Sequence, residues 1–189
     1  MDNPKIYFKA YKSELNDLLN DELFDSIKNL KNIIMDKYIN SSNIFICGNG
    51  GSGANANHIE NDFIFGVRNN SIINGIKIES LNSNNSVITC LANDVGYSEI
   101  FTEQLKNKCN KKDLLIVLSG SGNSPNILSA LNYTNDNNID NFSILGFDGG
   151  EALNLSKNYI HIKSNSMQIV EDVQMIIFHY LINIIKSKN

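Results

Sequence analysis

An unbroken apolar run, followed at once by a loop of glycines and serines, most constrains how this chain folds. The run covers residues 114–118, the loop reads Ser-Gly-Ser-Gly-Asn-Ser over residues 119–124, and Pro125 comes next. A short apolar run before such a loop is typical of a buried parallel strand. Ser124 can cap a helix, and proline suits a first helical turn. Glycines and a helix N-terminus together favour an anion. We therefore predict a phosphate-binding loop that lacks the lysine of a P-loop.

Short apolar runs alternate with helical stretches through the rest of the chain. The strands are expected at residues 43–47, 75–79, 113–118, 142–146 and 159–162. The helices that follow them are expected at residues 52–65, 84–92, 97–109, 125–134, 149–155 and 167–186. This alternation predicts an α/β fold with a doubly wound, flavodoxin-like sheet of five parallel strands.

Residues 5–40 precede the first strand and carry apolar residues at three-and-four spacing, which predicts helix. The run Asn20-Asp21-Glu22 can cap a second helix within this segment. We therefore expect one domain over residues 1–189, made of a helical arm (1–40) and an α/β core (41–189). The arm is a candidate for packing on the outside or for contacts between subunits.

Composition excludes several classes of protein. The chain has 189 residues and a formal net charge of -4, which argues against nucleic acid as a partner. Its three cysteines, Cys47, Cys90 and Cys109, have no CxxC spacing, so neither a disulfide framework nor a cysteine zinc site is expected. Cys47 and Cys90 lie in apolar runs and are expected to be buried thiols. No apolar run approaches the roughly 18 residues of a membrane span, and no signal-like segment opens the chain, so we expect a cytoplasmic protein without a membrane partner.

Two glycine-rich loops share one predicted edge of the sheet. Gly48-Asn49-Gly50-Gly51-Ser52 follows the first strand, and residues 119–124 follow the third. In open parallel sheets, ligands bind outside the carboxyl ends of the strands. The two loops are therefore expected to face one ligand.

With these loops in place, the chain resembles the sugar isomerase (SIS) domain family and, within it, the phosphoheptose isomerases. The resemblance rests on residues 47–52, His58, residues 92–96, residues 119–124, residues 146–150 and a last helix that ends near His179. It implies isomerisation of sedoheptulose 7-phosphate to a manno-heptose 7-phosphate, for capsule or lipopolysaccharide synthesis. It also implies a homotetramer with one Zn²⁺ per active site.

The resemblance also implies roles for individual residues. The phosphate would be held by Ser119, Gly120, Ser121 and Ser124. The sugar chain would be contacted by Asn49, Gly50, Gly51, Ser52, Asn93, Asp94 and Glu171. The metal and acid–base positions would be His58, Asp62, Glu171 and His179. Asp62 stands where the family usually has a glutamate, and Glu171 where a glutamine is usual. Both side chains can still bind a cation.

Helix geometry limits how these residues combine. His58 and Asp62 are four residues apart on an expected helix, and therefore share a face. Glu171 and His179 are eight apart on the last helix, which separates them by about 12 Å along its axis. One metal ion cannot easily bind both. Either the site takes residues from more than one subunit, or only one of the two is a ligand. Glu60 is expected to be exposed, and His161 to be structural or exposed.

The implied reaction moves a proton between two neighbouring carbons of an open-chain sugar through an enediol, which needs a positioned base and acid. We expect a carboxylate, Asp62 or alternatively Glu171, to work with His179. A zinc ion can polarise the sugar carbonyl. Two other functions stay open: a non-catalytic SIS module that binds a sugar phosphate or a protein partner, and an isomerase for a different sugar phosphate.

Overall fold

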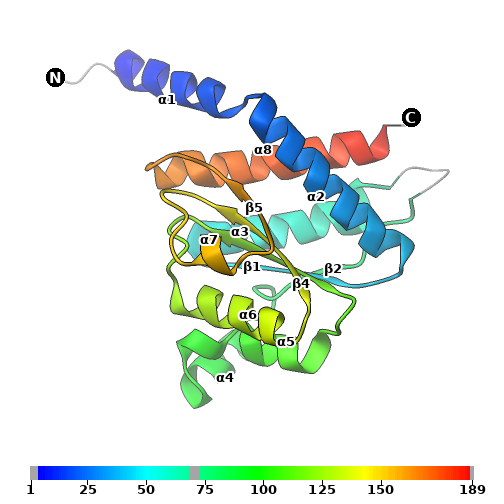
Figure 1. The fold of residues 1–189 in the computed structure, drawn as a ribbon. Coiled ribbons are helices and arrows are strands. Elements are labelled where there is room, and N and C mark those ends of the chain that lie inside the picture. Colours follow the sequence, from blue (N-terminus) through cyan, green and yellow to red (C-terminus); the bar gives the residue numbers. More distant parts are fainter. Residues whose placement is uncertain (1–3, 69–72, 188–189) are drawn as a thin grey trace.

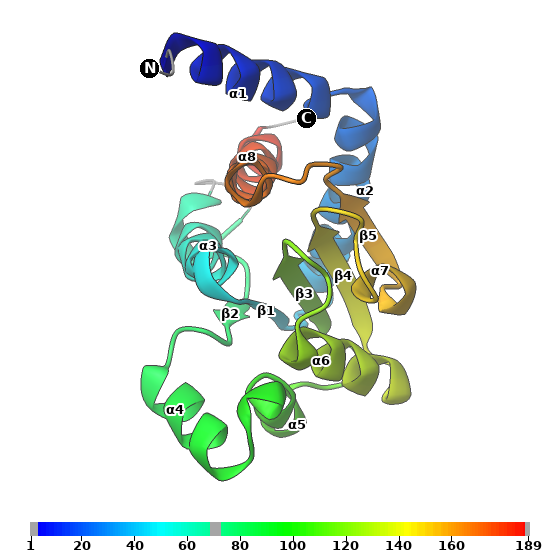
Figure 2. The same cartoon turned by 90° about the vertical axis from the view of Figure 1, so that its left-hand side faces the viewer.

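The computed structural model describes residues 4–68 and 73–187 and is built around one parallel sheet. The strands are ordered β2-β1-β3-β4-β5, and each neighbouring pair is parallel. Their bounds are β1 Ile44–Gly48, β2 Ile78–Ser80, β3 Leu114–Ser119, β4 Asp140–Leu145 and β5 Asn158–His161. Helices cover both faces (Figures 1 and 2). The predicted doubly wound α/β sheet is confirmed.

The helices lie close to their predicted positions. Two of them, α1 Pro4–Leu18 and α2 Asp21–Ile39, precede the sheet. The others are α3 Gly50–Asn61, α4 Asn85–Asp94, α5 Thr102–Lys108, α6 Pro125–Asp136, α7 Ala152–Leu155 and α8 Met167–Lys186, with short π- and 3₁₀-helical turns η1 Asp62–Gly66 and η2 Tyr97–Glu99. By length and composition α8 could cross a membrane, but half of its most apolar stretch is buried in the fold, as is usual for a core helix.

The strands divide the core into two layers because successive side chains of a strand point to opposite faces. Ile44 and Ile46 join the cluster under α2, α3 and α8, whereas Phe45 and Cys47 join the cluster under α5, α6 and α7. A strand buried on both faces is continuously apolar. This explains why the runs recognised in the sequence show no polar alternation.

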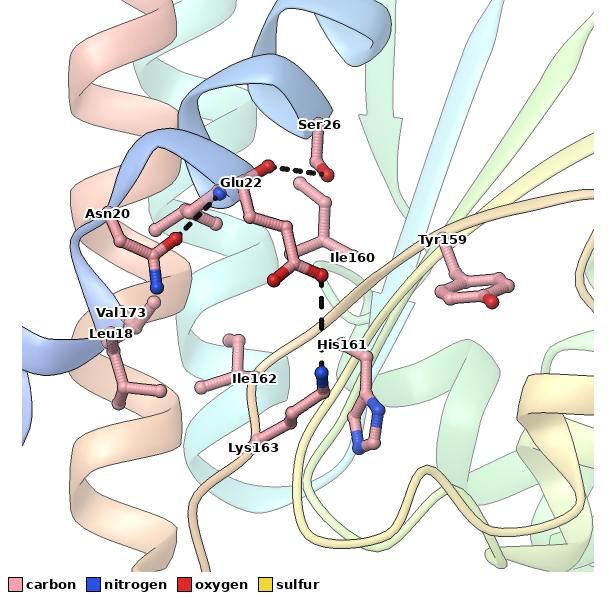
Figure 3. A pocket seen from close by; sticks show the side chains of 11 residues that line it. Leu18, Asn20, Glu22, Ser26, Tyr159, Ile160, His161, Ile162, Lys163 and Val173 are labelled. Atoms are coloured by element: carbon pink, nitrogen blue, oxygen red, sulfur yellow. Dashed lines mark hydrogen bonds and ion pairs between the residues drawn. The ribbon is translucent and has the colours of Figure 1, made fainter.

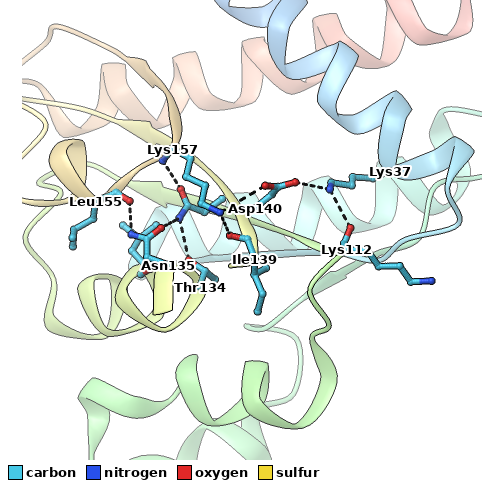
Figure 4. A network of polar contacts seen from close by, with 10 residues as sticks. Lys37, Lys112, Thr134, Asn135, Ile139, Asp140, Leu155 and Lys157 are labelled. Carbon is cyan, nitrogen blue, oxygen red and sulfur yellow. Dashed lines mark hydrogen bonds and ion pairs between the residues drawn. The ribbon is translucent and has the colours of Figure 1, made fainter. Parts of the chain in front are cut away.

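Lys37 of α2 bonds to residues at the amino-terminal edge of the sheet (Figure 4). The Nζ of Lys37 donates to Oδ2 of Asp140 at 2.7 Å and to the carbonyl of Lys112 at 3.0 Å. Lys157 lies on the other side of Asp140, with Nζ 3.8 Å from Oδ1. Lys37 is only 6% exposed, so its paired ammonium fixes where the helix meets the sheet.

Three local expectations were wrong. The second strand begins at Ile78 rather than at residue 75, since only residues 78–80 pair with β1 at this edge of the sheet. Cys90 is exposed, because α4 lies at the periphery of the molecule (Figure 2) and contains no buried residue. Glu60 is half-buried rather than exposed. Cys47 is buried as predicted.

Candidate functional site

The serine loop after β3 presents three hydroxyl groups with free donor capacity. The Oγ of Ser119 accepts from the backbone N–H of Gly122 at 3.0 Å, and the Oγ of Ser121 accepts from that of Asn123 at 3.3 Å. Ser124 occupies the N-cap position of α6, as predicted, but its side chain makes no capping bond. Within residues 4–68 and 73–187, no hydrogen bond donated by these three hydroxyls is found, so each can donate to a ligand.

A cavity of about 230 Å³ lies between the two glycine-rich loops. Nine predicted binding residues line it, namely Asn49, Gly50, Gly51, Ser52, Ser119, Gly120, Ser121, Ser124 and Glu171. Leu118 and Met167 complete the wall, so no lysine or arginine contributes. The site can therefore attract an anion only through neutral donors, namely the serine hydroxyls, the side-chain amide of Asn49 and the N-terminal N–H groups of α3 and α6.

Glu171 lies on the wall of this cavity, against the start of α3. Its carboxylate is so close to Gly51 that a Cβ at position 51 would collide with it. Its backbone carbonyl accepts from Nδ2 of Asn55 at 3.0 Å. Glycine at position 51 therefore makes room for a carboxylate beside a helix N-terminus, where negative charge is stabilised.

A second group of predicted residues meets farther along the same two helices. The Nε2 atoms of His58 and His179 are 3.2 Å apart, and Oδ2 of Asp62 is 3.4 Å from the first and 3.5 Å from the second. Ligands 2.0–2.2 Å from a tetrahedral zinc ion are about 3.3–3.6 Å from one another. This three-residue cluster therefore fits such an ion with one position left open.

The local fold explains why these three side chains converge. Asp62 begins the π-helical turn η1, but its N–H still bonds to the carbonyl of His58, so the two residues share a face. α3 and α8 lie side by side (Figures 1 and 2). The buried Gln174 fixes their register, because its Oε1 accepts from Asn55 at 3.1 Å and its Nε2 donates to Ser52 at 3.3 Å.

Glu171 does not join the cluster. Of the two distant residues of α8, only His179 lies with His58 and Asp62. Gly51 and His58 are seven residues apart on α3, and Glu171 and His179 are eight apart on α8. The cavity and the cluster are thus separated by about 10–12 Å along the helix axes.

Asn93 and Asp94 are placed differently from the other predicted residues. Both are exposed at the end of α4, where Nδ2 of Asn93 donates to Oδ1 of Asp94 at 2.7 Å. Neither lines the cavity.

Sequence reasoning also missed Tyr97 and Asn126, which both bond to Asn49. The signal for Asn126 was its place two residues after the serine loop, whereas Tyr97 carries no such signal.

Another cavity, of about 200 Å³, lies between the start of α2 and β5 (Figure 3). Glu22 and Lys163 form a loose ion pair across it at 4.0 Å. His161 lines it, and its Nε2 donates to the carbonyl of Phe147 at 2.9 Å. His161 is therefore a structural residue, and none of the predicted site residues lies in this cavity.

Comparison with known proteins gives consistent matches. Residues 7–146 match the family model of the SIS domain. The chain is 32% identical over 179 residues to a phosphoheptose isomerase of Helicobacter pylori strain P12, covering 95% of this chain and 92% of that protein. It is 30% identical to phosphoheptose isomerase 2 of Campylobacter jejuni, covering 100% and 95%. The structure of a phosphoheptose isomerase from Francisella tularensis superposes with a TM-score of 0.87 at 26% identity, covering 97% and 96%.

Proposed function

Because the chain belongs to the phosphoheptose isomerase family of SIS-domain proteins, we propose that it interconverts sedoheptulose 7-phosphate and D-glycero-D-manno-heptose 7-phosphate. The reaction passes through an enediol. It would take place in the cytoplasm and supply heptose for a surface polysaccharide, either capsule or lipopolysaccharide.

One observation carries this proposal: an anion cavity and a cluster of acid–base groups lie about 10–12 Å apart along two parallel-running helices. An extended seven-carbon sugar has its phosphate and its carbonyl at opposite ends. With the phosphate among the serine hydroxyls, the open chain can follow α3 and α8 to the cluster. Binding the phosphate there holds the reacting carbons in place.

The proton transfer is assigned to Asp62 and His179. Oδ2 of Asp62 faces both imidazoles, which leaves the other carboxylate oxygen to take the proton from the carbon next to the carbonyl. The Nε2 atom of His179 faces the other two side chains, so its imidazole returns a proton to the neighbouring carbon from Nδ1. The alternative base, Glu171, lies beside the phosphate cavity. Its position supports contact with the substrate rather than a place next to His179.

His58, Asp62 and His179 would hold a zinc ion, and their spacing supports this assignment. A bound zinc ion polarises the carbonyl and stabilises the charge that develops on its oxygen. Metal analysis tests the assignment directly. We expect the His58→Ala variant to lose bound zinc, whereas His161→Ala, which alters a histidine of the other cavity, keeps it. Unchanged zinc in His58→Ala would contradict the ligand set.

We also infer that copies of the chain assemble, as the homotetramer of the resemblance implies. α1 contains no buried residue and exposes Ile6, Tyr7 and Phe8, each more than 60% accessible. Such apolar surface on one helix favours a protein contact. The imidazoles of His58 and His179 are about half exposed, which leaves room for a neighbouring chain near the cluster.

The decisive experiment is to incubate the purified protein with sedoheptulose 7-phosphate and follow the product by NMR. Turnover that is lost with a chelator and restored with zinc is expected. Absence of turnover by metal-replete protein would contradict the isomerase and favour a non-catalytic sugar-phosphate module. Turnover of a five- or six-carbon ketose phosphate in preference to the heptose would keep the enzyme class and change the substrate.

A further inference from the structure

Asn49 has an unusual arrangement for the residue that starts a helix. It is the N-cap of α3, a position where asparagine normally accepts a hydrogen bond from the helix backbone. Here its side chain makes no capping bond. The amide is instead engaged by two residues from elsewhere in the chain, so a favourable local interaction has been exchanged for long-range ones.

The first partner is Asn126, in the first turn of α6. The two amides bond reciprocally: Nδ2 of Asn49 donates to Oδ1 of Asn126, and Nδ2 of Asn126 donates to Oδ1 of Asn49, both at 2.8 Å. Asn126 is only 1% exposed, so its polar atoms depend on this pair. Because Asn126 lies only two residues after the serine loop, the pair links one glycine-rich loop to the other.

The second partner is Tyr97 of η2, whose hydroxyl donates to Oδ1 of Asn49 at 3.0 Å. Tyr97 is 56% exposed, so core packing does not account for its position. The segment around Tyr97 is bonded to Ser129 of α6. The Oγ of Ser129 donates to Oε2 of Glu99 at 2.9 Å and lies 2.7 Å from Oγ1 of Thr102. Tyr97 is thus held from α6 while it reaches across to Asn49.

We propose that Tyr97 and Asn126 are positioning residues that hold the Asn49 amide in the orientation needed by the substrate, an inference that rests on the proposed function. Asn49 lines the phosphate cavity, and an amide nitrogen has two hydrogens. One of these bonds to Asn126. Tyr97 and Asn126 together fix the direction of the second amide hydrogen of Asn49. This hydrogen is the donor to an oxygen of the sugar phosphate.

The test is a double-mutant cycle with a matched control. Tyr97→Phe removes only the hydroxyl and is expected to lower kcat/KM roughly three- to tenfold, the effect of one neutral hydrogen bond. Tyr159→Phe removes the hydroxyl of another exposed tyrosine, which lies away from the site, and leaves kcat/KM unchanged. Inhibition by inorganic phosphate should persist in Tyr97→Phe, because the serine hydroxyls are intact.

If Tyr97 acts through Asn49, Tyr97→Phe has no further effect in an Asn49→Ala background. Additive losses in the double variant, or full activity of Tyr97→Phe, would overturn the proposal. A second readout does not depend on turnover. The side-chain amide NMR signals of Asn49, assigned by their loss in Asn49→Ala, should shift in Tyr97→Phe and not in Tyr159→Phe. Unchanged signals in Tyr97→Phe would overturn the proposal even if the enzyme acts on another sugar.

Discussion

Glu60 is a carboxylate that the fold holds partly out of water, on the same helix as His58. Burial raises its pKa, and a hydrogen bond from the backbone of Ser80 offsets part of this effect. Because the pKa of Glu60 is raised in the folded state, its contribution to stability is complete only below about pH 4, the ordinary pKa of a glutamate. That contribution is lost as the pH rises through the raised pKa.

We therefore predict that Glu60→Gln gains stability relative to the wild type as the pH rises from about 4 to neutral, because glutamine carries no charge to desolvate. Free energies of unfolding from urea titrations at several pH values measure this difference. Glu151→Gln, at an exposed site, serves as the control. A difference between wild type and Glu60→Gln that does not change with pH would show that burial of Glu60 has no energetic consequence.

Asn20 and Ser124 occupy the N-cap positions of α2 and α6, but of these two residues only Asn20 makes a capping bond. Asn20 accepts from the backbone N–H of Leu23 at 3.0 Å at the start of α2, whereas Ser124 makes no such bond at the start of α6. We predict that Asn20→Ala costs about 1 kcal/mol of stability. Ser124→Ala should cost less than about 0.5 kcal/mol but weaken inhibition by inorganic phosphate. Unfolding titrations and inhibition constants check both. Equal destabilisation by the two variants would mean that the Ser124 hydroxyl caps α6 after all.

Among the elements, those that the sequence predicted well are defined by local patterns. β1 and β3 are buried on both faces, so their continuous apolar runs marked them, and the loops that follow them supplied the cavity. β2 was misplaced because only three of its residues pair with β1. Cys90 was misjudged because an apolar helical pattern does not tell whether a sheet lies beneath it.

The site was predictable to the same extent. The rise per residue of a helix was enough to predict that Glu171 and His179 lie apart. In the structure, only His179 lies with His58 and Asp62. What could not be foreseen is the contact of Tyr97 with Asn49, since the two residues are 48 positions apart and nothing local in either segment indicates the other.

At the scale of the whole molecule, α1 is the element least attached to the rest. It contains no buried residue, and it is held by Tyr11, which donates to Asp172, by Glu14, which accepts from Ser164, and by partly buried Leu15 and Leu18. We predict that a chain lacking residues 1–18 still unfolds cooperatively but assembles into smaller species. Light scattering coupled to size-exclusion chromatography measures the assembly, and circular dichroism measures the unfolding. An unchanged oligomer would place the subunit contacts elsewhere.

Glu171 and His179 both come from α8, the last helix of the described chain. A ribosome makes the sheet and the serine loop first, and α8 emerges after them. Until that helix docks beside α3, His58 and Asp62 lack the imidazole of His179, and the cavity lacks one of its walls. A nascent chain without α8 therefore lacks the complete cluster of His58, Asp62 and His179, and any cation that the cluster holds can bind there only after α8 has docked.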